Sequence, residues 1–358
     1  MQKSMIILIV VIAVIVVAVA VTLLCVFLTK DNNKYIPKSE VEIVNSYDNT
    51  DELIQKFPVN SPTTVKEGIE KKIQNRLLTG FENWNRGFKA WKKWGDILYT
   101  QDSIYNVHGA RLTLAHYQDA MDDNLKKVNI QMGDFNSMII VDKYAAIRYE
   151  IKTAGRAGTV MEFVEFKDYG DELGTRVVEG WGGPKDDSYE DMCKFQGDEE
   201  KAVQQQQIND MINYIIPNGE TDLNIKYKIK YKIEYTNPHD ISILNIILEG
   251  IDKWNAGISV YKNWLDSAYT SNAINYDSRI QPRTMSKYKE EMEDLTTTYN
   301  IEKLYFDHIL IRDNWAGIHY RYRMENKQTR VKTVGDRMQF LQFEEISSNL
   351  KIILSWVK

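Results

Sequence analysis

The chain contains one segment twice, and this duplication constrains its fold more than any other feature. Residues 80–100 align without a gap with residues 250–270, and residues 129–151 align in the same way with residues 300–322. Later, Trp181 has its counterpart in Trp356, close to the end of the chain. Matches in one order over about a hundred positions indicate two copies of one structural unit. A chain of 358 residues is long enough for two such domains.

Each copy is predicted to consist of helices followed by strands. Phe81, Trp84, Phe88 and Trp91 recur at intervals of three and four residues, which is typical of one helical face. Further amphipathic helices are expected at 113–128 and 284–299. After them come alternating and β-branched runs, predicted as strands at 130–141, 144–152, 159–167 and 175–181, and in the second copy at 301–312, 315–324, 333–343 and 350–357. Helices followed by an antiparallel meander predict an α+β architecture.

Two prolines, a polar segment and a connector set the expected domain boundaries. Pro62 and Pro238 suit the first turn of a helix, where the missing amide hydrogen is not needed. The connector is expected to hold a helix at 201–216 and an amphipathic strand at 224–235, in which Ile and Tyr alternate with Lys or Glu. The predicted segments are an N-terminus (1–4), an apolar helix (5–28), a polar stalk (29–61), a first domain (62–183), the connector (184–237) and a second domain (238–358).

The apolar helix is predicted to be a membrane anchor. Residues 5–28 carry no charged side chain, and a helix of about 20 residues crosses a hydrocarbon core of about 30 Å. Bulky residues stand at 23–28, where a signal peptidase requires small ones, so we expect the segment to remain uncleaved. The lysines after this helix slightly favour a cytoplasmic C-terminal side, whereas large domains translocate largely regardless of charge. We predict a single-pass protein of the cell membrane with extracytoplasmic domains.

Charge and composition exclude several classes of function. A net charge of −5 gives no electrostatic basis for binding nucleic acid. The five histidines are scattered, and no phosphate-binding glycine loop, paired Cys-x-x-Cys motif or nucleophile elbow occurs. We therefore predict neither a metal site nor a cofactor.

Three sequence features resemble the NTF2-like superfamily, in particular its SnoaL-like members. They are the aromatic helix that ends Trp94-Gly95-Asp96-x-x-Tyr99, a short strand that leads to His108-Gly109, and the terminal strand Val177-Val178-Glu179-Gly180-Trp181. The resemblance covers about 62–183 and 238–358. It implies a curved sheet wrapped around helices to form a cone with a pocket at its open end. It also implies sheet faces that pair domains.

The resemblance leaves two classes of function open, because fold does not determine activity. The superfamily includes polyketide cyclases, ketosteroid isomerases and non-catalytic components of conjugation and secretion machinery with one anchor helix. Our first expectation is a non-enzymatic, membrane-anchored tandem protein that binds a ligand or a protein partner at the cell envelope. The alternative is a SnoaL-like cyclase or isomerase that acts on a small hydrophobic ketone by acid–base catalysis in the first domain.

Glu179 and His108 are the candidate catalytic residues. Val177, Glu179 and Trp181 are predicted to share one strand face, whose equivalent in the second copy is apolar, with Leu354 in place of Glu179. A carboxyl group there either acts as an acid or base in the cone, or reaches water or an arginine. His108 is either a pocket acid–base group or a surface residue.

Trp94, Tyr149 and Trp181 are the candidate ligand-pocket residues, although packing of helix against sheet explains them equally well. Because the second copy lacks counterparts of Glu179 and His108, any ligand site is expected in the first copy. We expect the second copy to be architectural.

Overall fold

The computed structural model describes residues 50–62, 65–153, 156–171, 173–183, 188–277 and 282–358. All described residues lie within one compact unit, Tyr47–Lys358. The predicted anchor at 5–28 and most of the predicted stalk lie outside them. Within the described ranges, no helix combines the length and the apolar character that a membrane crossing requires.

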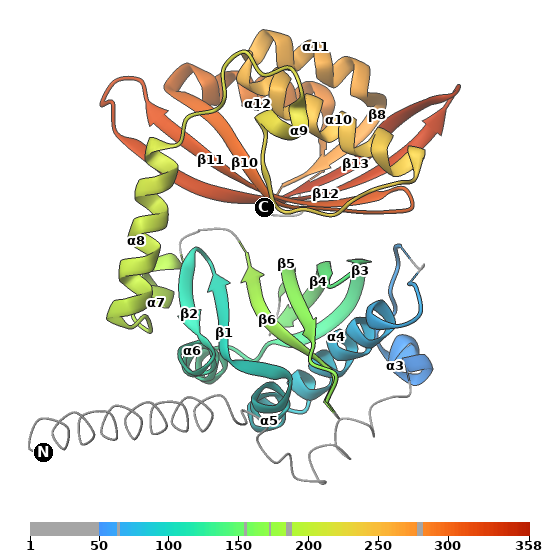
Figure 1. Cartoon of the computed structure of the whole chain (residues 1–358), viewed down its shortest axis with the longest axis vertical. Helices are drawn as coiled ribbons and strands as arrows, with labels where there is room; N and C mark the ends of the chain where they lie inside the picture. Colours follow the sequence, from blue (N-terminus) through green and yellow to red (C-terminus); the bar gives the residue numbers. More distant parts are fainter. Residues whose placement is uncertain (1–49, 63–64, 154–155, 172, 184–187, 278–281) are drawn as a thin grey trace, which may run out of the picture. The chain divides into compact units, whose positions relative to one another are not determined.

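The first half of the described chain is a mixed six-stranded sheet with helices on one face (Figure 1). Its strand order is β2-β1-β6-β5-β4-β3, and β1 pairs with β6 in parallel. The elements are α3 (Thr50–Lys56), α4 (Ile69–Asn85), α5 (Phe88–Leu98), β1 (Tyr99–Val107), β2 (Ala110–Thr113), α6 (Leu114–Lys127), β3 (Gln131–Val141), β4 (Tyr144–Thr153), β5 (Arg156–Asp168) and β6 (Thr175–Gly182).

The second half repeats this order and adds one strand. Its sheet runs β9-β8-β13-β12-β11-β10-β7, and β8 pairs with β13 in parallel. The elements are α9 (Leu223–Lys226), β7 (Ile229–Tyr231), α10 (Pro238–Asn255), α11 (Ile258–Ala268), β8 (Tyr269–Tyr276), β9 (Pro282–Thr284), α12 (Met285–Thr298), β10 (Tyr299–Arg312), β11 (Trp315–Asn326), β12 (Lys332–Ile346) and β13 (Asn349–Val357). The predicted α+β class is confirmed.

The predicted long strands are confirmed, and three other predictions are wrong in detail. The aromatic stripe of the first copy spans two helices, because Gly87 adopts a φ of 108° and ends α4. Helix α4 begins at Ile69, well after Pro62. The sheets are not purely antiparallel, since β1 and β8 each pair in parallel with a strand far along the chain.

The stalk and the connector also differ from expectation. Residues 50–61 are not a free stalk, because Leu53 and Phe57 are buried in the apolar core of the first half. The predicted strand at 224–235 forms only the short strand β7, preceded by helix α9, whose N-cap Asp222 accepts a hydrogen bond from the Asn224 amide. Tyr227, Tyr231 and Tyr235 of this segment donate hydrogen bonds to Asp252, Glu179 and the Ile309 carbonyl, respectively. The three side chains therefore have separate partners and do not form one common face.

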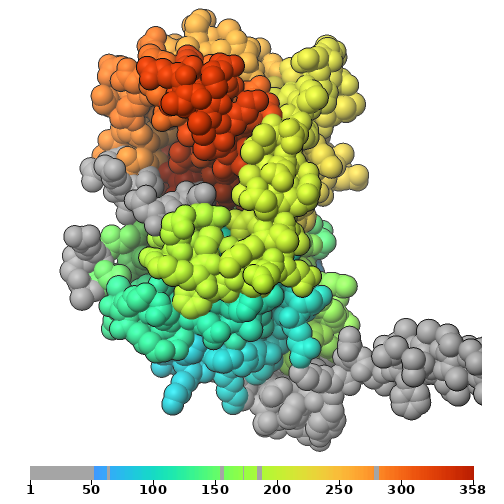
Figure 2. Space-filling model, turned by 90° about the vertical axis from the view of Figure 1, so that its left-hand side faces the viewer, coloured from blue at the N-terminus to red at the C-terminus, as the bar shows by residue number. Residues whose placement is uncertain are grey.

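The connector contains two helices, α7 (Tyr189–Cys193) and α8 (Asp198–Asn213), and α8 contacts both halves. The residues of the connector form a continuous surface in Figure 2. Near the middle of α8, Gln204 donates to the Gly109 carbonyl at 2.6 Å, and near its C-terminal end the Ile212 carbonyl accepts a hydrogen bond of 2.6 Å from Arg323. A buried apolar cluster likewise contains residues of both sheets, including Phe163 and Trp181 with Met338 and Phe340.

Candidate functional site

A cavity of about 200 Å³ lies between the helices and the sheet of the first half. Its walls are mostly aromatic and aliphatic, because α4, α5 and α6 turn one apolar face towards the concave side of the sheet. The aromatic side chains that line it are Phe81, Trp84, Trp91, Trp94, Tyr99, Tyr105, Tyr117, Tyr149 and Phe166. An apolar cavity of about 150 Å³ is enough to hold benzene, so this one fits a molecule of one or two rings.

One carboxyl group faces this apolar cavity. Glu162 of β5 accepts hydrogen bonds from the hydroxyls of Tyr149 at 2.7 Å and Tyr105 at 2.9 Å, one on each carboxyl oxygen. Burial raises the pKa of the Glu162 carboxyl, and the two tyrosine hydrogen bonds lower it again in part. The same burial raises the pKa of both tyrosines well above the usual value, so they remain hydroxyl donors. The cavity therefore has one polar, hydrogen-bonding corner.

Glycines in β6 give Tyr105 its place beside Glu162. A Cβ atom on Gly180 would lie 2.2 Å from the Tyr105 ring, and one on Gly182 would lie 3.0 Å from it. Tyr105 also stacks on Tyr117 with ring centroids 4.1 Å apart. The missing side chains thus let the phenol lie flat against the strand and point its hydroxyl at Glu162.

His108 lies at the edge of the same cavity. It occupies a two-residue turn between β1 and β2, where His108 has a φ of 48° and Gly109 a φ of 85°, the geometry of a tight hairpin turn. His108, Gly182 and Lys358 all line the cavity. Both His108 and Lys358 favour the ionised form of Glu162 and lower its pKa. His108 is therefore close enough to influence the buried carboxyl electrostatically.

Glu179 lies on the other face of the sheet, outside the lining of this cavity. The register between β5 and β6 shifts where Phe166 pairs with Val177 and Glu165 with Glu179. This bulge ends the alternation, so Val177 faces the cavity whereas Glu179 does not. The Glu179 carboxylate accepts hydrogen bonds from Asn106 at 3.1 Å and from Tyr231 at 2.9 Å. The structure therefore does not bring Glu179 and His108 to one site.

The three candidate pocket residues divide in the same way. Trp94 and Tyr149 line the cavity, and the Trp94 indole donates to the Thr79 hydroxyl at 3.1 Å. Trp181 belongs instead to the cluster that joins the two sheets, with its ring 4.6 Å from that of His308.

Glu162 is not among the site residues predicted from the sequence. A signal for it existed, because Glu162 stands between Met161 and Phe163 and between Val160 and Val164, in a strand apolar on both faces. A carboxyl group in such a strand is buried whichever face of the sheet it points to.

The second half contains two cavities in the equivalent place, of about 340 Å³ and 30 Å³. Lys303 and Tyr320 line both cavities. The counterpart of Glu162 is Gln339, which lines the smaller cavity and donates to the Ser355 hydroxyl at 2.9 Å. The expectation that the second copy is only architectural therefore does not account for these cavities.

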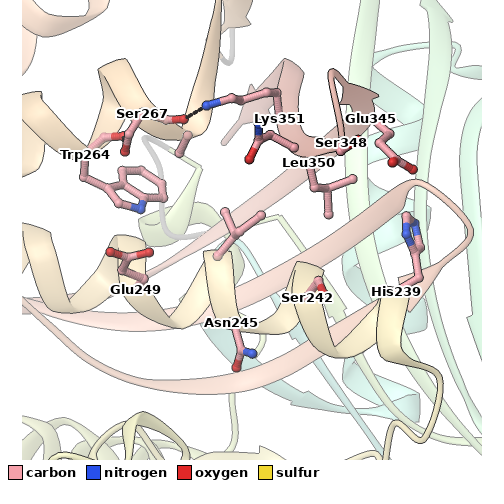
Figure 3. Close-up of a pocket in the computed structure, with 13 residues that line it drawn as sticks. His239, Ser242, Asn245, Glu249, Trp264, Ser267, Glu345, Ser348, Leu350 and Lys351 are labelled. Atoms are coloured by element: carbon pink, nitrogen blue, oxygen red, sulfur yellow. Dashed lines mark hydrogen bonds between the residues drawn. The ribbon is translucent and has the colours of Figure 1, made fainter.

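A larger depression is a surface groove of about 570 Å³ beside α10 and α11 (Figure 3). Its polar side chains include Ser242, Asn245, Glu249 and Glu345, which are all exposed. Lys351 reaches across one end to donate to the Ser267 carbonyl. None of the described polar residues that line this groove is buried. Among the described residues, no group of His, Cys, Asp and Glu side chains is arranged to hold a metal ion.

The chain is similar in part to crystal structures of NTF2-like and SnoaL-like proteins. They include a ketosteroid isomerase-like protein from Erwinia carotovora (12% identity, 34% of this chain and 95% of that one, TM-score 0.28). Others are a SnoaL-like polyketide cyclase from Agrobacterium tumefaciens (14%, 32% and 89%, 0.27) and an NTF2-like protein of unknown function from Pseudomonas putida (12%, 34% and 85%, 0.27). No family model and no curated protein matches the chain.

Proposed function

We propose that this chain is a membrane-anchored protein with two tandem NTF2-like domains, and that the first domain binds a small, mainly apolar molecule with one polar group. The observation that carries the proposal is the mostly apolar cavity of about 200 Å³ with the hydrogen-bonded carboxyl group of Glu162 in its lining. Ligand sites of this kind combine apolar walls with a few convergent polar groups that fix orientation. The repeated strand order of the two sheets supports the division into two domains.

The arrangement of Glu162 supports binding in preference to catalysis. Each of its oxygens already accepts a hydrogen bond from a tyrosine hydroxyl. A general base has to accept the substrate proton on an oxygen that is free to approach it. Because Tyr149 and Tyr105 donate their hydroxyl hydrogens to Glu162, the two phenol oxygens keep lone pairs that can accept a hydrogen bond from a ligand hydroxyl.

The test is ligand-induced thermal stabilisation of the full chain in a non-ionic detergent. Three probes of one size separate shape from polarity, namely tetralin, 2-tetralone and 2-naphthol. We expect 2-naphthol, which can donate a hydrogen bond to the phenol oxygens, to raise the melting temperature more than tetralin or 2-tetralone, and Glu162→Gln to remove this difference. Gln is the residue of the second domain at the equivalent position, Gln339. Glu179→Leu is the matched control, because it also removes a carboxylate, but outside the cavity.

Equal stabilisation by all three probes in both the parent and Glu162→Gln would contradict a polar recognition corner. Loss of the response in Glu179→Leu but not in Glu162→Gln would move the site to the opposite face of the sheet. No stabilisation by any of the probes would contradict binding of a one- or two-ring molecule.

One observation favours the enzymatic alternative, an isomerase- or cyclase-like acid–base reaction. Burial raises the pKa of Glu162, and His108 lines the same cavity, so a carboxylic acid and an imidazole would face one substrate. The test is exchange of the C1 protons of 2-tetralone in D₂O, followed by NMR. Exchange faster than in buffer that is lost in Glu162→Gln supports catalysis, whereas binding without exchange supports the non-enzymatic function.

Membrane attachment through residues 5–28, with the domains outside the cytoplasm, is the second part of the proposal. Its support is the uncharged sequence of that segment. Carbonate washing of membranes tests the attachment, since an integral protein stays in the pellet. Proteolysis of intact cells or spheroplasts tests the orientation, because extracytoplasmic domains are digested without lysis. Release by carbonate would contradict the anchor, and protection until lysis would reverse the orientation.

A further inference from the structure

The cavity of about 340 Å³ in the second half contains a cation that has no carboxylate partner among the described residues. Lys303 of β10 lines this cavity and also the adjacent smaller one. Its ammonium nitrogen lies 4.8 Å from the ring centroid of Trp254, 5.1 Å from that of Tyr320 and 5.3 Å from that of Tyr261. Aromatic faces attract a cation but supply no net negative charge. The ammonium group is thus held in place without being neutralised.

The alignment of the two copies shows that this lysine is a specific difference between the domains. Lys303 occupies the place of Met132, and Arg337 occupies the place of Val160. Both Met132 and Val160 line the first cavity, and Lys303 and Arg337 both line the second. The second domain therefore exchanges two apolar side chains for two cations, and it replaces the buried Glu162 by Gln339. At these aligned positions the first cavity thus carries a carboxyl group, whereas the second carries two cations.

The rest of the lining is suited to an apolar body attached to an anion. Met292, Leu295 and Ile301 provide apolar surface, and Arg337 is exposed at the side of the cavity. Arg283 also lines it but is paired with Glu291. Asp277 is the one carboxylate in the described lining. Lys303 and Arg337 thus leave an excess of positive charge between apolar walls.

Burial and charge make the ammonium ion costly in this place. Burial, together with the neighbouring Arg337, lowers the pKa of Lys303 to about 7. A buried charge of this kind is stabilised most by a counter-ion that arrives with its own apolar shielding.

We propose that the second domain binds an amphiphilic carboxylate in this cavity, with the carboxylate group between Lys303 and Arg337 and the apolar part against Met292, Leu295 and Ile301. The inference is independent of the ligand assigned to the first domain. A carboxylate fits better than inorganic phosphate, because most of the lining is apolar and only two unpaired cations are available. A cavity of this volume admits a two-ring acid, by comparison with about 150 Å³ for benzene.

The experiment is calorimetric titration of the full chain in a non-ionic detergent with 2-naphthoate, using 2-naphthamide as an isosteric neutral probe and inorganic phosphate as an anion without an apolar part. We expect one naphthoate per chain, an affinity at least about 10-fold weaker for the amide and no measurable binding of phosphate. Lys303→Met, which restores the residue of the first domain, should weaken naphthoate binding by about 10-fold or more. Lys287→Met is the matched control, because it removes an exposed lysine from α12.

A second measurement keeps the proposal testable if a variant alters the fold. Since an anion raises the pKa of Lys303, binding takes up a proton above about pH 7, and naphthoate affinity should fall as the pH rises from 7 to 9. The titratable groups that line the two cavities around Lys303 are Tyr261, Tyr269, Asp277, Arg283, Tyr288, Tyr299, Tyr320, Tyr322 and Arg337. Burial raises the pKa of Tyr261, Tyr269, Tyr288, Tyr320 and Tyr322, so these five stay neutral over this range.

Three results would overturn the proposal. Equal affinity for naphthoate and naphthamide would show that the charge is not recognised. An equal loss in Lys303→Met and Lys287→Met would show that only net charge matters. Loss of naphthoate binding in Glu162→Gln but not in Lys303→Met would place the acid in the first cavity, and would leave the proposed function of the first domain standing.

Discussion

The guanidinium of Arg312 donates a hydrogen bond of 2.6 Å to the carboxylate of Glu70, 242 residues earlier in the chain. Arg312 ends β10 in the second half, and Glu70 lies in the first turn of α4 in the first half. Both side chains are buried, with 9% and 6% of their surface exposed. Arg312 also donates to the Ile140 carbonyl at 2.7 Å, so one arginine bonds to two elements of the other half.

Arg312→Met is expected to destabilise the protein by about 3–5 kcal/mol, because it leaves the Glu70 carboxylate buried without its cation. Replacing both residues, as Arg312→Met with Glu70→Gln, should recover part of the loss, since the uncompensated charge disappears. Urea denaturation of the full chain measures both. Lys126→Met, which removes an exposed pair with Asp122, is the control and should cost less than about 0.5 kcal/mol. If the loss of unfolding free energy in the double variant equals the sum of the losses in Arg312→Met and in Glu70→Gln alone, the two side chains are not coupled.

Much of the secondary structure could be predicted, because β-branched alternation and helical spacing are local signals. The eight long strands lie within a few residues of their predicted bounds. The break at Gly87 was missed because the aromatic spacing continues through it, whereas the backbone there adopts a conformation that favours glycine.

The candidate site was harder to predict, for two physical reasons. A β-bulge reverses the face of every residue beyond it, and no sequence pattern marked the bulge before Glu179. The second reason is that a cavity depends on what several distant elements leave unfilled. The exchange of Met132 for Lys303 was visible in the aligned copies, but its meaning required the three aromatic rings around the ammonium group.

His308 is expected to make the protein sensitive to acid. It is fully buried, neither ring nitrogen has a hydrogen-bond partner among the described residues, and its ring stacks on Tyr231 with centroids 4.5 Å apart. Burial and the neighbouring His319 lower the pKa of His308 well below its usual value. The unfolded chain binds a proton at about pH 6.5 and the folded protein does not, so stability is lost as the pH falls below that value.

The variant His308→Phe tests this dependence. Between pH 7 and 5.5 its stability should fall by about 1 kcal/mol less than that of the parent. At pH 8 the His308 imidazole is neutral in both the folded and the unfolded parent. The variant should then be as stable as the parent or more stable, because two buried nitrogens without hydrogen bonds are removed. The groups around His308, namely Asp307, His319, Arg321 and Lys230, are present in both proteins. Parallel profiles from pH 8 to 5.5 would exclude His308 as the cause.

Gly180→Ala is expected to disturb the polar corner of the first cavity. A Cβ atom there would lie 2.2 Å from the Tyr105 ring, so the ring has to move and its hydrogen bond to Glu162 is strained. We expect a loss of about 1–3 kcal/mol in urea denaturation, with a weaker thermal response to 2-naphthol. Gly95→Ala is the control, since it adds the same methyl group inside α5 at ordinary contact distance and should be neutral or stabilising. An unchanged response to 2-naphthol in Gly180→Ala would separate Tyr105 from recognition.

Lys303→Met is expected to stabilise the protein while it removes the carboxylate site. Burial lowers the pKa of Lys303 to about 7 in the folded protein, whereas an unfolded lysine titrates at about pH 10.4. The unfolded state therefore binds more protons between these values, so the cost of the lysine is complete below pH 7 and disappears as the pH approaches 10. Because the Lys303 side chain keeps some accessible surface, we expect the free energy of unfolding of the variant to exceed that of the parent by about 2 kcal/mol at pH 6. This difference should shrink towards pH 10. Urea denaturation at pH 6, 8 and 10 measures it, with Lys287→Met as the control of equal charge. A variant less stable than the parent at every pH would mean that the aromatic rings stabilise the ammonium ion by more than its burial costs.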